Sequence, residues 1–234
     1  MSKPDDRLLT LLRSCALFAN LSDKALAPLL GRAAVRKFAK GVVIYRRGEP
    51  GSSLMIIASG RIKIANVSPE GKEVVLNFLR AGDVSGEIAV LDEGERTADA
   101  VALEPTEALV ISSRDLLPVL TANPEALLSI TRLLCEKLRA ASAIVEDNTL
   151  EMRSRAAKGL LRLAQRHGKV GNDGILVDLV LSQQDLGNYL GISRENVSRQ
   201  LRQLRFANVI RVDEGHIIIT DKIGLGEIAE DVAN

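Results

Sequence analysis

The chain has 234 residues, room for one large domain or two small ones, and its 46% hydrophobic and 26% charged residues are typical of a globular protein. The formal net charge of +1 excludes a polycation, so any contact with nucleic acid must come from a local basic surface. No apolar run approaches the roughly 18 residues that a membrane span needs. The apolar stretch 8–19 is interrupted by Arg13, which predicts an amphipathic helix rather than a signal peptide, and a cytoplasmic protein without membrane association.

The cysteines and histidines do not form a metal-binding pattern. Cys15 and Cys135 have no CxxC or CxxH spacing, which argues against a disulfide framework, a zinc site or an iron–sulfur cluster, and we expect two buried thiols. His167 and His216 lie too far apart in sequence to suggest a metal pair or a catalytic dyad. A redox or gas sensor would need a cysteine cluster or a haem ligand set, and Cys15 alone supplies neither.

Residues 35–112 consist of short apolar runs separated by glycines. The runs are rich in β-branched residues and follow one another at spacings near ten residues, which predicts a small antiparallel sandwich or barrel. The expected strands are 42–45, 54–58, 62–65, 74–79 and 108–111.

A long helix is predicted over residues 123–148, with Asn123 as its N-cap and Pro124 as its first residue. A stripe at alternating spacings of four and three residues indicates a helix packed lengthwise against another helix. This stripe could cover the β domain, but its narrow width favours a dimer seam, with the polar Asn148 helping to fix the register. The predicted seam residues are Leu127, Thr131, Leu134, Leu138, Ala141, Val145 and Asn148.

The third segment begins with an amphipathic helix over 154–168, which Gly168 is expected to end, followed by a flexible loop over 168–174 and a short strand. Residues 182–206 then predict a helix-turn-helix. Ser182 and Asp185 resemble a capping box, Gly191 supplies the turn, and Ser193 caps the second helix, whose inward residues are Val197, Leu201 and Leu204.

The outward face of the second helix carries the residues expected to contact DNA. Residues 182–211 hold five arginines against Asp185 and Glu195, and an arginine fork can pair with guanine while a glutamate accepts from cytosine. A solvated charged face is the alternative, but a predicted hairpin of strands 209–212 and 217–220 follows directly and completes a winged helix-turn-helix. The candidate DNA-binding residues are Ser182, Gln183, Ser193, Arg194, Glu195, Ser198, Arg199 and Arg202.

A second constellation lies in residues 86–98 of the β segment. Gly86 lets backbone amides approach an anion, Arg96 offers charge-assisted bonds to a phosphate, and Thr97 adds a hydroxyl. Glu87 would repel a phosphate, so a ribose hydroxyl is its natural partner. The pattern predicts a nucleotide site and contains no nucleophile. Because the chain also has no P-loop, nucleophile elbow or His/Asp pair, we do not expect an enzyme.

Over nearly its whole length the chain resembles the cyclic AMP receptor protein (catabolite activator) family, within the superfamily that includes the fumarate–nitrate regulators. The recognition-helix pattern S-R-E-x-V-x-R matches Ser193 to Arg199, and the phosphate-binding cassette matches Gly86, Glu87, Ile88, Ala89, Arg96, Thr97 and Ala98. The resemblance implies Arg96 on the cyclic phosphate, Glu87 on the ribose 2′-hydroxyl, a GTGA-like inverted repeat of double-stranded DNA, and contact with RNA polymerase through the loop 168–174.

The chain departs from the family pattern at the residues that contact the base of the nucleotide. Cyclic AMP sensors of the family present adjacent Thr-Ser from the long helix, and here the pair is Ala141 and Ser142, so one hydrogen bond of about 0.5–1.5 kcal/mol is missing. Asn77 and Phe78 are further candidates near the base. Three effectors therefore remain as alternatives: cyclic AMP, cyclic GMP and a different small molecule. The sequence does not decide between an activator and a repressor.

The expected fold class is α+β, with three parts. Residues 1–122 form a jelly-roll-like, cyclic-nucleotide-binding β-roll with N-terminal helices, 123–152 the long dimerisation helix and hinge, and 153–234 the winged helix-turn-helix domain. We expect a homodimer that carries a cyclic nucleotide as its effector and has no metal, haem or iron–sulfur cluster.

Overall fold

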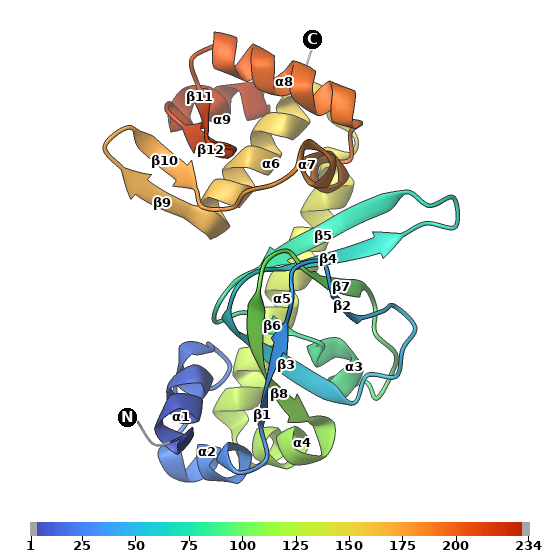
Figure 1. Cartoon of the computed structure of the whole chain (residues 1–234), viewed down its shortest axis with the longest axis vertical. Coiled ribbons are helices and arrows are strands. Elements are labelled where there is room, and N and C mark those ends of the chain that lie inside the picture. Colours follow the sequence, from blue (N-terminus) through green and yellow to red (C-terminus); the bar gives the residue numbers. More distant parts are fainter. Residues whose placement is uncertain (1–3, 231–234) are drawn as a thin grey trace. The chain divides into compact units, whose positions relative to one another are not determined.

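A computed structural model describes residues 4–230 of the chain, and side chains from residue 6 onward (Figure 1). The chain divides into two compact units, the first ending at Arg139 and the second beginning at Ala140. Helix α5 (Pro124–Asp147) belongs partly to each unit. Within the described residues, no helix combines the length and the apolar character needed to cross a membrane.

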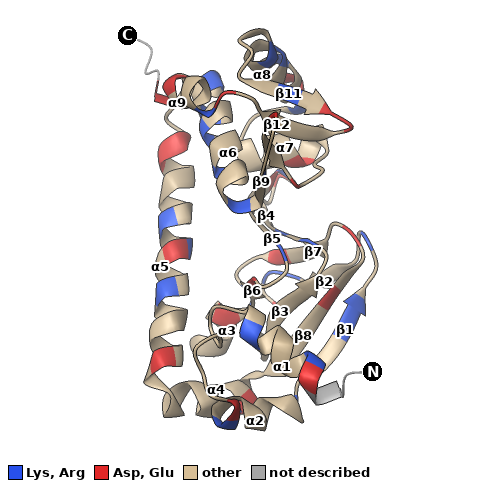
Figure 2. Cartoon of the chain, turned by 90° about the vertical axis from the view of Figure 1, so that its left-hand side faces the viewer, with Lys and Arg blue, Asp and Glu red and all other residues tan. Residues whose placement is uncertain are grey.

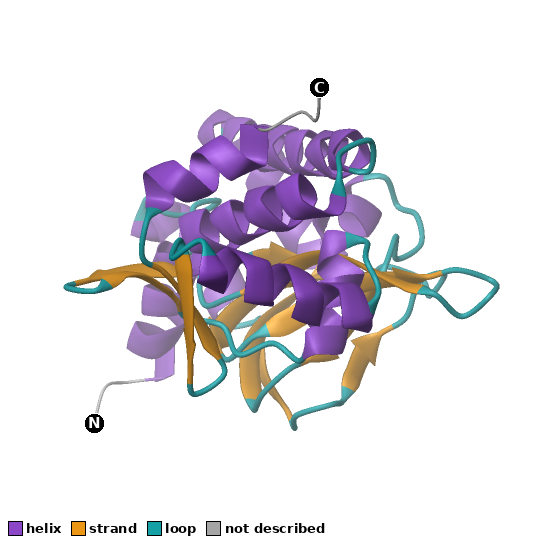
Figure 3. Ribbon diagram, turned by 90° about the horizontal axis from the view of Figure 1, so that it is seen from above, coloured by secondary structure: helices purple, strands orange, loops and turns teal. Residues whose placement is uncertain are grey.

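The first unit is built from two four-stranded antiparallel sheets and flanking helices. Figure 3 distinguishes the helices and strands of the two units by colour. The predicted sandwich is therefore confirmed, with three strands (β1, β6 and β7) added to the expected ones. The sheet orders are β1-β8-β3-β6 and β2-β7-β4-β5. The elements are α1 (Pro4–Ser14), α2 (Asp23–Leu30), β1 (Ala34–Phe38), β2 (Val43–Tyr45), β3 (Ser53–Ser59), β4 (Ile62–Val67), β5 (Glu73–Leu79), β6 (Val84–Ser85), α3 (Glu87–Leu91), β7 (Asp99–Ala102), β8 (Thr106–Ser112) and α4 (Ser113–Ala122).

Strand β3 is buried on both faces because two apolar clusters meet at it. Leu54 and Ile56 belong to the cluster shared with helices α1, α2, α4 and the start of α5. Met55 and Ile57 belong to the cluster between the two sheets. A strand covered on both sides has no polar alternation, which explains the continuous apolar run at 54–58.

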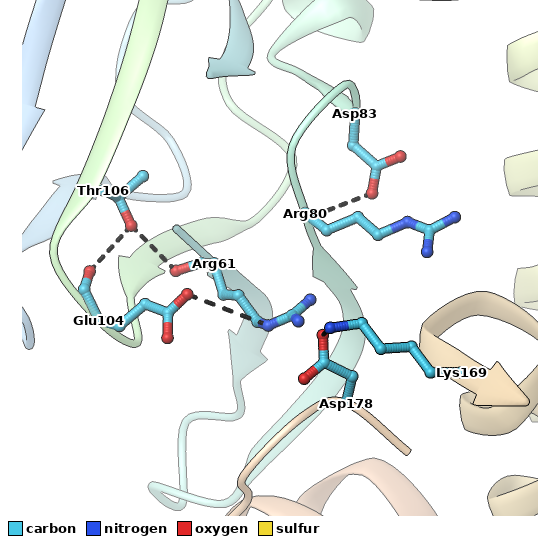
Figure 4. A network of polar contacts seen from close by, with 7 residues as sticks. All are labelled: Arg61, Arg80, Asp83, Glu104, Thr106, Lys169 and Asp178. Atoms are coloured by element: carbon cyan, nitrogen blue, oxygen red, sulfur yellow. Dashed lines mark hydrogen bonds and ion pairs between the residues drawn. The ribbon is translucent and has the colours of Figure 1, made fainter. Parts of the chain in front are cut away.

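A buried hydroxyl joins two neighbouring turns of the first unit. Figure 4 shows Thr106 Oγ1 donating to the carbonyl oxygens of Glu104 at 2.8 Å and Arg61 at 3.3 Å. Gly60 lies in the same corner with φ +85°, and a Cβ there would be 2.4 Å from Thr106 Oγ1. The β3–β4 turn therefore requires glycine. In the turn before β6, the Arg80 amide donates to Asp83 at 3.0 Å (Figure 4).

The second unit is a winged helix-turn-helix, as predicted. Its four-stranded antiparallel sheet has the order β11-β12-β10-β9. The turn between the wing strands contains Glu214 and Gly215, both at positive φ. The elements after α5 are α6 (Met152–His167), β9 (Gly168–Gly171), β10 (Gly174–Val177), α7 (Gln183–Leu190), α8 (Arg194–Phe206), β11 (Ile210–Asp213), β12 (His216–Ile219) and α9 (Lys222–Glu230).

The prediction of a flexible loop over 168–174 was wrong, because these residues form the β9–β10 hairpin. Strand β10 also pairs with β12, a long-range contact that local sequence does not reveal. Gly168 is extended rather than left-handed, since the strand begins directly where α6 ends. Lys169 and Asp178 form an ion pair at 2.9 Å at the ends of the hairpin (Figure 4).

Asn123 stands at the N-cap position of α5, as predicted, because its carbonyl accepts from the Ala126 and Leu127 amides at 3.0 and 3.3 Å. Its side-chain amide donates to Val119 O at the end of α4 at 2.7 Å. Two local expectations, on Cys135 and Leu201, are corrected. Cys15 is buried but Cys135 is exposed. Asn148 lies one residue beyond the end of α5, and its place on the dimer seam stays a prediction. The buried residues of α8 are Val197, Gln200 and Leu204, whereas Leu201 is only half-buried.

Candidate functional site

The Arg96 guanidinium is buried among polar groups of the first unit. Its side chain follows the short helix α3 in sequence and is 7% exposed. Nη1 donates to Gly86 O at 3.1 Å, and Nη2 donates to Ser53 Oγ at 3.2 Å. The guanidinium carbon lies 4.5 Å from the centroid of the Tyr45 ring. A guanidinium has five N–H donors, so these contacts orient the fork and leave donors for an anion.

Tyr45 and Ser85 lie beside the Arg96 guanidinium and continue its polar surroundings. The Tyr45 hydroxyl and Ser85 Oγ share a short hydrogen bond, and Ser85 is 2% exposed. Burial raises the pKa of the Tyr45 phenol above its usual range, against the opposing effects of the Ser85 bond and the Arg96 charge. The phenol therefore stays neutral and supplies a flat surface under the guanidinium, a cation–π contact.

Gly86 is required by the position of Arg96. Its φ is +83°, and a Cβ on it would lie 2.0 Å from Arg96 Nη1 and 2.9 Å from Ser53 O. Both the backbone conformation and the space exclude a side chain at residue 86. From sequence, Gly86 is expected to let backbone amides approach an anion, and in the structure it also makes room for Arg96 Nη1.

Glu87 is paired with a lysine that sequence analysis missed. Its side chain is 2% exposed, and Lys137 Nζ on α5 donates to Oε1 at 2.6 Å and to Val84 O at 3.5 Å. The second carboxylate oxygen, Oε2, is buried without a hydrogen-bond partner. Such a group normally carries a desolvation penalty of about 1–3 kcal/mol, which a donor from a ligand would relieve.

The remaining predicted effector residues differ in exposure. Ala89 and Ala98 are buried at 1% and 4% and serve the core, while Ile88 is half-buried and Thr97 exposed. Asn77 Oδ1 accepts from the Phe78 amide at 2.9 Å, and Phe78 is fully buried. Ser142 is exposed and lies in the second compact unit. The structure thus brings Gly86, Glu87 and Arg96 together, and adds Tyr45, Ser53, Ser85 and Lys137 to them.

Helix α5 presents two different stripes of side chains. Ala126, Ile130 and Leu133 pack against the helical core cluster of the first unit, and Lys137 continues their spacing. The stripe predicted as a dimer seam lies one residue further along. Leu138 and Val145 are 68% and 69% exposed, Leu127 is 40% exposed, and Leu134 is half-buried. Thr131 and Ala141 are exposed as well. The seam stripe is therefore not the face that covers the β domain.

The helix-turn-helix forms from the local signals that predicted it. Ser182 Oγ accepts from the Asp185 amide at 2.9 Å and donates to Asp185 Oδ2 at 2.6 Å. Gly191 ends α7 in the left-handed conformation with φ +66°. Ser193 accepts from the Asn196 amide at 3.3 Å at the start of α8. Gly187 also belongs to this turn, because a Cβ on it would lie 2.8 Å from Ile192 O.

The outward face of α8 is polar and cationic (Figure 2). Arg194, Glu195, Arg199 and Arg202 are exposed, and Ser198 donates to Gln183 Oε1 at 2.8 Å, which joins α8 to the start of α7. Glu195 has a lowered pKa, because its own backbone amide, Ser193 and Arg194 favour the charged form. An ionised acceptor beside arginine forks at a helix N-terminus is suited to base edges in a major groove.

Comparisons with known proteins identify both units. Residues 35–123 match the model of the cyclic nucleotide-binding domain, and residues 154–228 match that of the Crp-like helix-turn-helix domain. The Cyclic AMP receptor protein of Thermus thermophilus is 31% identical over 93% of this chain and 98% of its own length. The CRP-like cAMP-activated global transcriptional regulator of Mycobacterium tuberculosis is 29% identical over 90% of this chain and 95% of its own.

The structure of FixK2 from Bradyrhizobium japonicum has the same fold, with a TM-score of 0.76 over 86% of this chain and 99% of that one, at 22% identity. Because residues 154–228 match the Crp-like helix-turn-helix domain and the Mycobacterium tuberculosis relative is named a transcriptional regulator, the expectation of a regulator rather than an enzyme is confirmed.

Proposed function

Because the chain belongs to the CRP/FNR family of transcription regulators, we propose that it acts as a homodimer whose affinity for operator DNA is set by a cyclic nucleotide. The observation that carries this proposal is the pair formed by Arg96 and Glu87. One supplies a buried guanidinium with donors to spare, and the other a buried carboxylate oxygen without a partner. A cyclic phosphate and a ribose hydroxyl are complementary to these two groups in charge and in hydrogen bonding.

The proposed effector site comprises the residues that were predicted for it, together with Lys137. Arg96 and Thr97 bind the cyclic phosphate beside Gly86. Glu87 accepts the ribose 2′-hydroxyl, and Lys137 holds Glu87 in place from α5. Ile88, Ala89 and Ala98 support the cassette, whereas Asn77 and Ser142 are proposed contacts of the base.

Cyclic AMP is the first candidate effector because the two curated relatives are named for it. Cyclic GMP, or tolerance of both bases, is the alternative, because Ala141 replaces a hydroxyl-bearing residue of the family pair. A further alternative is a different small effector on the same fold. In each case the effector can raise DNA affinity only through its preference for the DNA-competent dimer.

Calorimetric titration of the purified protein with cyclic AMP and, in parallel, with cyclic GMP measures the affinity for each nucleotide and so tests which one is the effector. We expect binding of at least one of them, and a loss of affinity on the order of 100-fold in Arg96→Ala, since charge-assisted hydrogen bonds each contribute about 1.5–3 kcal/mol. Arg36→Ala, which removes an exposed arginine from β1, is the matched control and should bind as the wild type does. Equal affinities in wild type and Arg96→Ala would refute the assignment of the phosphate site.

The proposed DNA target is an inverted repeat of GTGA-like half-sites, contacted by two copies of α8 about 34 Å apart. Arg194, Glu195 and Arg199 would contact base edges, whereas Ser182, Gln183, Ser193, Ser198 and Arg202 would complete the interface. In fluorescence anisotropy, Arg199→Ala should relax the base preference at one position by about 1–3 kcal/mol. A uniform loss of affinity for every sequence would instead make Arg199 a phosphate contact.

The homodimer is proposed to form along the exposed seam of α5, from Leu127 to Val145. The functional boundaries are proposed to follow residues 122 and 152, which separate the effector domain, the dimerisation helix with its hinge, and the DNA-binding domain.

RNA polymerase is a proposed partner by analogy with the family. Its contact would lie on the β9–β10 hairpin, where Val170 is 88% exposed.

A further inference from the structure

Helix α6 carries two arginines on one face, Arg155 and Arg162, with Gly159 between them. Residues four and three positions apart lie on the same side of a helix. Gly159 is buried against α7, and a Cβ on it would lie 2.1 Å from Leu190 Cδ2. The missing side chain brings α6 and α7 close together (Figure 1), with one arginine on each side of the contact.

Arg155 binds the turn after α5 and the end of α7 at the same time. Its Nη2 donates to Asn148 O at 2.8 Å and to Leu150 O at 2.9 Å, and its Nη1 donates to Gly191 O at 3.3 Å. The Gly191 carbonyl lies at the C-terminal end of α7, where carbonyls lack an intrahelical donor and carry the negative end of the helix dipole, so a guanidinium is a fitting partner for it. Gly191 is also where the chain turns toward the recognition helix α8.

Arg162 makes the second connection. It forms an ion pair with Asp147, the last residue of α5, whose side chain is only 7% exposed. The Arg162 guanidinium carbon lies 5.8 Å from the centroid of the Tyr189 ring on α7. Burial opposes the charge of Arg162, but a hydrogen bond and electrostatic attraction to Tyr189 and to Asp147 outweigh it and raise the pKa of the guanidinium.

We propose that Arg155 and Arg162 together hold the last turn of α5 against the DNA-binding helices, an arrangement called the clamp below. Through Asp147, Arg162 and Tyr189, a movement of α5 would then change the position of α7 and α8. Four residues, 148–151, separate α5 from α6, and without the clamp this connector could bend independently of α7. Buried ion pairs contribute little net stability but specify one geometry, which is what a transmitting joint needs. These are positioning residues, and the inference rests on the proposed function.

The test compares Arg162→Met and Asp147→Asn with Arg166→Met, which removes an exposed arginine from the last turn of the same helix. Anisotropy gives the operator affinity with and without saturating cyclic nucleotide, and the ratio of the two is the coupling factor. We expect this factor to fall about tenfold or more toward unity in Arg162→Met and Asp147→Asn, and to keep its wild-type value in Arg166→Met. Because coupling is reciprocal, nucleotide affinities with and without operator should converge in the two clamp variants.

Tyr189→Phe is a milder variant that keeps the aromatic ring and removes only the hydroxyl, so a changed coupling factor in it cannot be ascribed to loss of the fold. We expect it to lower the coupling factor partially. Hydrogen exchange provides a readout that needs no effector, and the amides of 148–151 should exchange about tenfold faster in Arg162→Met than in Arg166→Met. Wild-type coupling in Arg162→Met, or unchanged exchange at 148–151, overturns the clamp. A wild-type protein without any coupling would refute the proposed function instead, and the exchange measurement would still decide the clamp.

Discussion

Replacing Lys137 tests the proposed effector site without altering a predicted phosphate contact. Lys137→Met removes the ammonium group from the 2%-exposed Glu87 carboxylate and leaves an apolar side chain of similar length on α5. Breaking a fully buried ion pair by removing one partner costs about 3–5 kcal/mol. The Lys137 side chain is 29% exposed, so water can replace part of the interaction, and we expect a loss of about 2–3 kcal/mol in the free energy of unfolding.

Urea or thermal denaturation of the full chain, monitored by circular dichroism, measures this loss. A lowering of about 4–12 °C in the melting temperature corresponds to it for a chain of this size. The double variant Glu87→Gln/Lys137→Met provides the control, because it removes the stranded charge and should recover at least about 1 kcal/mol relative to Lys137→Met alone. If Lys137→Met is as stable as the wild type, or the double variant recovers nothing, then Lys137 does not neutralise Glu87 and the reasoning fails.

Gly86→Ala should abolish nucleotide binding in calorimetry, because the new Cβ would displace Arg96 and the left-handed backbone alone costs about 1–2 kcal/mol; full affinity would show that Arg96 does not need this position. Leu138 is 68% exposed, and the proposed dimer would bury one copy from each subunit. Leu138→Glu should therefore weaken the proposed dimer on the order of 100-fold in analytical ultracentrifugation, and an unchanged dimer would place the interface elsewhere. Cys135 should react with a thiol reagent in the native protein, whereas Cys15 should react only on unfolding, because burial raises its pKa to about 11; equal rates would contradict the described core.

The parts of the site that could be predicted from sequence depend on local chemistry. The capping box of Ser182 and Asp185 and the left-handed Gly191 act within a few residues, so the amino-acid sequence alone was enough to predict the helix-turn-helix. Gly86 was also identified, but not its contact with Arg96 ten residues away. The spacing alone could not show that the glycine makes room for the arginine.

The missed features depend on long-range pairing. The β9–β10 hairpin is held by β12, some forty residues later, so glycine-rich residues 168–174 were mistaken for a loop. Tyr45 and Ser53 reach Arg96 from other strands, and nothing in their local sequence distinguishes them from ordinary strand residues. Lys137 could have been found, because it lies at helical spacing from Ala126, Ile130 and Leu133, but only once that stripe was known to cover the β domain.

The two stripes of α5 connect the proposed effector site with the proposed dimer contact. Lys137 and Leu138 are consecutive, so their side chains differ by about 100° around the helix axis, and one faces Glu87 while the other is exposed. In the proposed site, a ligand hydroxyl on Glu87 Oε2 and the Lys137 ammonium on Oε1 share one carboxylate, so the ligand acts through Glu87 on the helix that carries Leu138. Any rotation of α5 that follows must turn both stripes together, because an α-helix is rigid over two adjacent residues. Coupling of nucleotide binding to dimer geometry thus needs no relay of intermediate side chains.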